Sequence, residues 1–297
     1  MMSGYDPTVT QRIYSRAVYE RGYAGSSMDY LVELVIRLRR VYASIFLSAI
    51  FIFFIPERFL DGEYTLQDYS PGIYRIMMTI LQTSVEMMLK TNVQIIVSSP
   101  LTTISIGAQV ALILAFVLNI PFLLWNIYQF AAPGLYVHER RILREAMVVL
   151  AGLFFLGSAI AYFIVTPTTL NVLTVISSPL INYGNGEVPL ALFFTLESIY
   201  SIIIWTVFSA GLLYMIPGVI YILVVMEIID PDYLVKNRKS VILAVLTFAA
   251  VITPDPTMVS MLVLSGPLLV VYEATIQMGY RNRFSRKLHT SNVWRQL

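Results

Sequence analysis

The sequence contains no cysteine and only two histidines, and Asp, Glu, Lys and Arg make up 13% of its 297 residues. In a soluble domain, charged residues usually make up about a quarter of the sequence. The missing thiols exclude disulfides, cysteine nucleophiles and cysteine metal sites. A His-Glu-x-x-His motif, a phosphate-binding glycine loop and a nucleophile elbow are also absent, so we expect no enzyme, metal site or cofactor. The net charge of +2 does not indicate a nucleic-acid partner.

Long apolar stretches take the place of the missing charge. Asp, Glu, Lys and Arg are absent from residues 91–138, 146–186 and 198–226. A helix needs about 20 apolar residues to cross the roughly 30 Å hydrocarbon core of a bilayer. Because lipid offers the backbone no hydrogen-bond partners, such stretches form helices. The sequence therefore predicts an all-α membrane protein, a bundle of six transmembrane helices at residues 41–55, 104–125, 147–165, 194–224, 241–252 and 258–277.

The basic residues predict the orientation of this bundle. When the N-terminus is placed in the cytoplasm, seventeen of the twenty Lys and Arg residues lie on the cytoplasmic side. Only Arg58, Arg75 and Lys90 then lie outside. Cytoplasmic loops of membrane proteins carry an excess of Lys and Arg, and the opposite orientation would reverse the ratio. We therefore expect the N-terminus and the C-terminus in the cytoplasm.

These predictions divide the chain into three parts. The three parts are a cytoplasmic segment at residues 1–40 that ends in an amphipathic helix, a membrane domain at 41–277, and a basic cytoplasmic tail at 278–297. Within the first outer segment, apolar residues at helical spacing in 72–97 predict a helix lying along the outer face.

The fifth predicted span is short. Fifteen uncharged residues separate Lys239 from Asp255, and they form only about 22 Å of helix. Either the bilayer thins around this span or the following turn lies below the outer lipid surface.

One cytoplasmic loop carries a specific motif. Residues 130–141 read FAAPGLYVHERR, and this stretch closely resembles the loop signature of the TatC family. The stretch YLVELVIR at 30–37 is similar to the N-terminal motif of that family. TPDP at 253–256, followed by Tyr272 and Glu273, resembles its short outer turn and last helix. The resemblance covers residues 30 to 277 in the order and topology of the family.

The sequence departs from the family pattern at three positions. Tyr30 replaces a histidine, and Val35 replaces the first of two arginines. Met215, two residues before Pro217, lies where the family often has Glu or Gln, so a buried carboxylate is not expected there. Glu197 lies eighteen residues earlier and cannot simply replace it.

The resemblance implies a function in protein export. It implies the core and signal-peptide receptor subunit of the twin-arginine translocase, which exports folded proteins across the membrane and uses the proton-motive force. The implied partners are twin-arginine signal peptides and single-span Tat components of the TatA and TatB type, in an oligomeric complex within the cell membrane of a prokaryote. A small-molecule secondary transporter is the alternative, although the inverted repeats expected of one are not evident.

Two carboxylates match the arginine-binding positions of the family, Glu33 and Glu139. A guanidinium presents a planar set of donors that a carboxylate can meet with two hydrogen bonds, whereas lysine lacks that geometry. The residues leave a second interpretation open, in which Glu33 pairs with Arg37 and Glu139 with Arg140 or Arg141. The resemblance assigns six further residues to the signal-peptide surface: Arg37, Phe130, Pro133, Leu135, Tyr136 and Arg140.

Four residues in or near the spans are candidates for a groove or a partner contact: Glu197, Met215, Asp255 and Glu273. A carboxylate inside a membrane is a functional candidate by default. Asp255 lies between two prolines and is equally typical of an exposed turn. Glu273 lies near the inner end of the sixth span, where we expect it to pair with Arg281 or Arg283.

Overall fold

A computed structural model describes residues 27–55, 71–86, 94–182, 193–226, 228–253 and 258–294. Most of the predicted segment 1–40 and Asp255 lie outside the described residues. The helices are α2 (Ser27–Phe54), α3 (Gly72–Glu86), α4 (Pro100–Ala131), α5 (Val137–Ile160), α6 (Thr166–Asn182), α7 (Leu196–Val225), α8 (Pro231–Lys236), α9 (Arg238–Ile252) and α10 (Met258–Trp294). Two short strands complete the described elements, β1 (Gln94–Ile96) and β2 (Phe193–Thr195).

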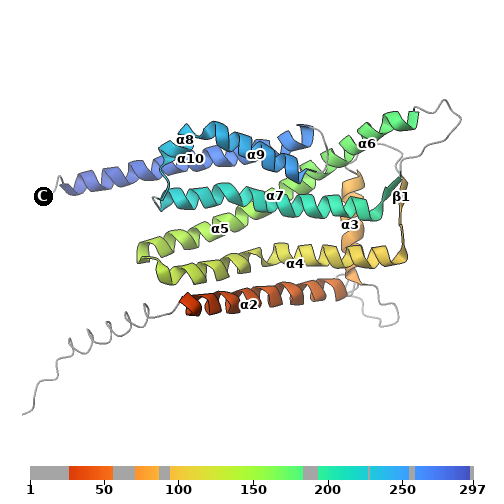
Figure 1. Ribbon diagram of the computed structural model, residues 1–297, viewed down its shortest axis with the longest axis horizontal. Coiled ribbons are helices and arrows are strands. Elements are labelled where there is room, and N and C mark those ends of the chain that lie inside the picture. Colours follow the sequence, from red (N-terminus) through yellow and green to blue (C-terminus); the bar gives the residue numbers. More distant parts are fainter. Residues whose placement is uncertain are drawn as a thin grey trace, which may run out of the picture.

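The long helices lie side by side in one bundle, and α3 runs across one end of it (Figure 1). The start of α2, the α4–α5 turn, α8 and the end of α10 lie at the opposite end (Figure 1). We call this opposite end the inner end, since the basic residues predict that it faces the cytoplasm. The end that carries α3 is called the outer end.

The predicted all-α membrane fold is confirmed. Four helical segments among the described residues are long and apolar enough to cross a membrane: Pro100–Gly134, Glu139–Ser177, Leu196–Val225 and Met258–Arg281. They correspond to the second, third, fourth and sixth predicted spans. The first predicted span lies within α2, which also contains the amphipathic segment, and the fifth lies within α9, which has only 15 residues. The count of six spans therefore stays a prediction.

Three boundaries differ from the prediction. The third span does not end at residue 165, because a π-helical segment, Ala161–Val165, leads from α5 directly into α6. The fourth span begins at Leu196, since residues 193–195 form β2, which pairs in parallel with β1. The predicted outer helix at 72–97 ends at Glu86, and Gln94–Ile96 within it is β1. A three-residue strand has too short a pattern to separate from the flanking apolar residues.

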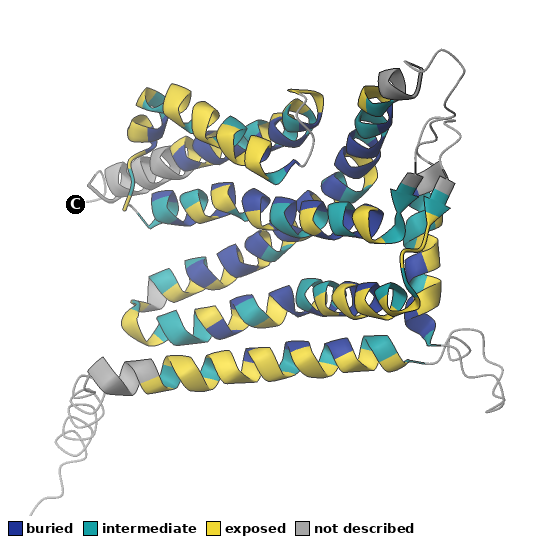
Figure 2. Ribbon diagram, turned by 45° about the vertical axis from the view of Figure 1, so that its right-hand side comes forward, coloured by how far each residue is buried: buried dark blue, intermediate teal, exposed yellow. Residues whose placement is uncertain are grey.

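Close packing holds α5 against α7. A Cβ atom at Gly157 would lie 2.6 Å from Cβ of Tyr214, and one at Gly211 would lie 2.5 Å from Oγ of Ser158. Glycine at these positions lets the two backbones approach, which is the usual means of helix association in lipid. Buried residues are concentrated along this pair of helices, whereas α2 is mainly exposed (Figure 2).

Hydrogen bonds hold α2 against α4. The Asn119 side chain accepts from Ser44 at 2.6 Å and donates to Ser48 at 3.1 Å, so it joins the two helices. Its amide also donates to the Ala115 carbonyl of α4 at 2.7 Å. Asn119 is 9% exposed, so the polar group lies buried with its partners.

Candidate functional site

The α4–α5 turn lies at the inner end and is closed by local hydrogen bonds. Pro133 lies in a single 3₁₀ turn, Ala132–Gly134, that follows α4. The backbone N–H of Leu135 donates to the Ala132 carbonyl at 3.3 Å, and Nε of Arg140 donates to the Leu135 carbonyl at 3.0 Å. These bonds close the turn between the two helices.

Glu139 lies in the first turn of α5. Its Oε2 accepts from the backbone N–H of Tyr136 at 2.9 Å, as the acidic residue of a capping box does. The positive end of the helix dipole also favours a carboxylate at this position. The alternative pairing of Glu139 with Arg140 or Arg141 is not seen among the described residues, because Arg141 pairs with Glu145 at 3.1 Å and Nε of Arg140 donates to the Leu135 carbonyl at 3.0 Å. The backbone provides Glu139 with a closer partner than either arginine.

Glu33 lies on α2 and pairs with Arg37 one turn later. Nε and one terminal nitrogen of Arg37 donate to the same oxygen, Oε1 of Glu33, at 3.0 and 2.6 Å. The other terminal nitrogen of Arg37 donates to Oε1 of Gln129 at 2.7 Å. The predicted pair of Glu33 and Arg37 is therefore confirmed. Gln129 is a member of the site that sequence reasoning missed, although it directly precedes the loop motif.

Each of the two carboxylates has one oxygen in an internal hydrogen bond. Within the described part of the chain, Oε2 of Glu33 and Oε1 of Glu139 accept no hydrogen bond. The Glu33 side chain is 41% exposed, so solvent or a ligand can reach it. A guanidinium can meet such a carboxylate through its open oxygen in a charge-assisted hydrogen bond.

The apolar residues of the loop motif differ in exposure. Tyr136 is 81% exposed, Pro133 is exposed, and Phe130 is half-buried. Leu135 is half-buried and packs against the cluster of α4 and α5 that includes Leu143. Tyr136 and Pro133 are thus accessible to a ligand, whereas Leu135 anchors the turn.

The groove and partner candidates do not lie together. Met215 of α7 is half-buried against the apolar cluster of α4 and α5, where a thioether fits. Glu197 is exposed in the first turn of α7. Glu273 of α10 pairs with Arg238 of α9 at 2.5 Å, a partner that the sequence did not predict, whereas the side chain of Arg283 lies outside the described part of the chain. The pair forms because α9 begins beside this part of α10.

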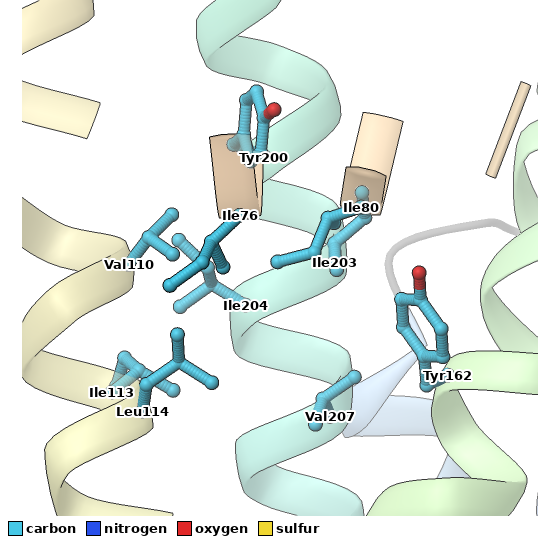
Figure 3. Close-up of a pocket in the computed structure, with 10 residues that line it drawn as sticks. All are labelled: Ile76, Ile80, Val110, Ile113, Leu114, Tyr162, Tyr200, Ile203, Ile204 and Val207. Carbon is cyan, nitrogen blue, oxygen red and sulfur yellow. The ribbon is translucent and has the colours of Figure 1, made fainter. Parts of the chain in front are cut away.

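An apolar cavity of about 350 Å³ lies between α3, α4 and α7. Side chains from these helices and Tyr162 turn toward a common space (Figure 3). The lining residues are Ile76, Ile80, Val110, Ile113, Leu114, Tyr162, Tyr200, Ile203, Ile204 and Val207. The Tyr200 hydroxyl donates to the Met77 carbonyl at 2.5 Å. None of these lining residues is charged, and the lining is apolar apart from the two tyrosine hydroxyls, Tyr162 and Tyr200.

Fold and site together define a multi-pass helical membrane protein with carboxylates exposed at one end of its bundle. A family model described as Sec-independent protein translocase protein (TatC) matches residues 29–267. The chain therefore belongs to the TatC family, and the resemblance seen in the sequence is confirmed. The family is one of protein translocase components, which disfavours the small-molecule transporter.

Curated relatives agree with this family. The TatC protein of Carboxydothermus hydrogenoformans is 34% identical over 168 residues, which cover 57% of this chain and 65% of that relative. The TatC protein of Halothiobacillus neapolitanus is 29% identical over 257 residues, which cover 86% of this chain and 62% of that relative. The chain thus spans slightly less than two thirds of the length of these relatives.

Two crystal structures of the twin-arginine translocase receptor TatC share the fold. The first has a TM-score of 0.61 at 23% identity and covers 86% of this chain and 99% of its own. The second, in DDM, has a TM-score of 0.60 at 25% identity and covers 84% and 99%.

Proposed function

We propose that this chain is the signal-peptide receptor and core of a twin-arginine translocase. The observation that carries the proposal is the pair of carboxylates, Glu33 and Glu139, at the inner end of the bundle. Each keeps one oxygen open among the described residues. Two consecutive arginines require two such acceptors near the headgroups, and guanidinium geometry makes arginine better than lysine there.

The remaining residues of the loop motif have supporting roles in this proposal. Tyr136 and Pro133 contact the signal peptide beside its arginines, since both are exposed next to Glu139. Phe130 presents a half-buried ring at the same turn. Arg140 holds the Leu135 carbonyl and so keeps the turn in its conformation.

Binding of a twin-arginine peptide to the purified protein tests the proposal. We expect Glu33→Gln and Glu139→Gln each to weaken binding by about tenfold or more, because each loses a charge-assisted hydrogen bond. Glu145→Gln is the matched control, since Glu145 is an exposed carboxylate one helical turn and a half further along α5. A peptide with two lysines should bind less tightly than the arginine peptide. Wild-type affinity and unchanged arginine preference in both variants would refute the site.

The topology forms part of the same proposal. The chain crosses the cell membrane of a prokaryote six times, with its N-terminus and C-terminus in the cytoplasm. The charge distribution supports this orientation, and the start of α2 and the end of α10 lie at one end of the bundle (Figure 1). Cysteines introduced near each end should react with an impermeant thiol reagent only after the membrane is broken, and the native chain has no cysteine to interfere.

Single-span Tat components are the proposed partners of the oligomeric complex. The short helix α9 and the adjacent half of α10 expose apolar side chains, including Leu243, Val251 and Leu262. Local bilayer thinning around the 15 residues of α9 would favour a partner helix there. Photo-crosslinking from Val251 should capture a single-span component, whereas crosslinking from Tyr42 of α2 should not. An equal yield from both positions would argue against this surface. The proton-motive force energises export in this proposal.

A further inference from the structure

The contact between Arg37 and Glu33 has the chemistry that a substrate arginine requires. Arg37 places two nitrogens on Oε1 of Glu33, at 3.0 and 2.6 Å. A guanidinium of this chain therefore already occupies one of the two carboxylates proposed to bind the signal peptide. Glu139 differs, because its internal partner is a backbone N–H and not a cation.

The position of Arg37 is better defined than that of an ordinary surface arginine. Its side chain is 19% exposed, whereas Arg141, which pairs with Glu145 at the same spacing, is 76% exposed. The third contact of Arg37, to Oε1 of Gln129 at 2.7 Å, ties it to the end of α4. An exposed pair four residues apart contributes only a few tenths of a kcal/mol, so the Gln129 contact and the partial burial distinguish Arg37 from Arg141.

We propose that Arg37 is an internal occupant of a substrate-arginine position, so that it competes with the signal peptide for Glu33. This inference rests on the proposed function. When a signal peptide binds, its guanidinium makes two hydrogen bonds to Glu33, one to the open Oε2 and one to the Oε1 that Arg37 occupies. Arg37 therefore moves away from Glu33 while it keeps its bond to Gln129. Gln129 has no net charge, so it holds the displaced arginine without competing with the substrate for a carboxylate.

The exchange has two consequences for recognition. Glu33 is never left as an unpaired carboxylate in the absence of substrate, because Arg37 neutralises it. A ligand must also replace the bifurcated contact to Oε1, and lysine, with a single ammonium, does so less well than a planar guanidinium. Arg37 thereby acts as a specificity-determining residue, because a weakly binding or single-arginine ligand has to supply more binding free energy to displace it from Glu33.

Binding of a twin-arginine peptide to the detergent-purified full chain tests this competition. We expect Arg37→Gln to raise the affinity by about three- to tenfold, because the charge-assisted contact of Arg37 with Oε1 of Glu33 no longer has to be displaced. In the same variant, the ratio of the affinity for the arginine peptide to that for a lysine peptide should be smaller than in the wild type. Arg141→Gln removes the same charge from the inner end and is the matched control, with an expected rise below about twofold.

A second variant tests the role of Gln129. Gln129→Leu removes the acceptor that receives displaced Arg37, so the affinity for the twin-arginine peptide should fall by about two- to fivefold. This variant also keeps the test available if Arg37→Gln does not fold. An affinity in Arg37→Gln that is equal to or below that of Arg141→Gln would overturn the competition, and so would an affinity in Gln129→Leu at or above wild type.

Failure of the proposed receptor site and failure of the proposed competition give different results in these variants. If Glu33→Gln and Glu139→Gln retain full binding, the proposed receptor site is wrong. If they lose binding while Arg37→Gln also loses it, the receptor site stands and Arg37 only orients Glu33.

Discussion

The contact between α5 and α7 is built mainly from glycine and buried side chains, with one hydrogen bond from Ser158 to the Val207 carbonyl, whereas the inner end is held by hydrogen bonds among half-exposed polar groups. In the first region Tyr214 lies directly against Gly157, and Gly211 lies against Phe154. In the second region Arg37, Gln129 and Glu33 form a chain of contacts between α2 and α4. The difference predicts that substitutions at the first region affect mainly stability, and that substitutions at the second affect mainly the proposed peptide binding.

One added methyl group at the α5–α7 contact should have the largest effect on stability. Gly157→Ala places a Cβ atom 2.6 Å from Tyr214, and such overpacking costs about 1–3 kcal/mol. Gly152→Ala is the control in the same helix, since nothing lies within 4 Å of its Cβ position, and it should be neutral or slightly stabilising. The melting temperatures of the two variants, measured in detergent by circular dichroism, test this difference. Equal melting temperatures would show that the contact is not tight.

The polar contact between α2 and α4 should have an intermediate effect. Asn119→Leu removes the hydrogen bonds to Ser44 and Ser48, and interhelical bonds of this kind contribute on average about 0.6 kcal/mol each in a membrane protein. We expect a total loss of about 1 kcal/mol in unfolding free energy. Ser209→Ala is the control, because Ser209 bonds only to carbonyls of its own helix. A loss no larger than that of the control would place the α2–α4 interaction in apolar packing alone.

The smallest effect on stability should come from the proposed signal-peptide surface. Glutamine also satisfies a capping box, so Glu139→Gln keeps an acceptor for the Tyr136 N–H and should change the unfolding free energy by less than about 0.5 kcal/mol. Binding of the twin-arginine peptide should nevertheless fall by about tenfold or more. A melting temperature that falls as far as in Gly157→Ala would contradict the separation of the two regions.

Much of the fold follows from local patterns in the sequence. The apolar stretches that became α4, α5, α7 and α10 are long enough to be recognised one at a time, because each must satisfy its backbone within a single helix. The strands β1 and β2 were missed, since they pair across nearly 100 residues of chain and each has only three residues. Continuity of α5 into α6 was missed because a π-helical segment has no period of its own in the sequence.

The candidate site was predictable in most of its residues but in only one of its contacts, the pair of Glu33 and Arg37. The membrane class, the charge asymmetry and the motif that contains Glu139 follow from the sequence, because they depend on composition and order along the chain. The Glu33–Arg37 pair was also predictable from the sequence, since residues four apart lie about one helical turn from each other. The contacts of Gln129 with Arg37 and of Arg238 with Glu273 depend instead on how the helices pack. Those partners are 92 and 35 residues apart, and helix packing alone brings them within hydrogen-bond distance.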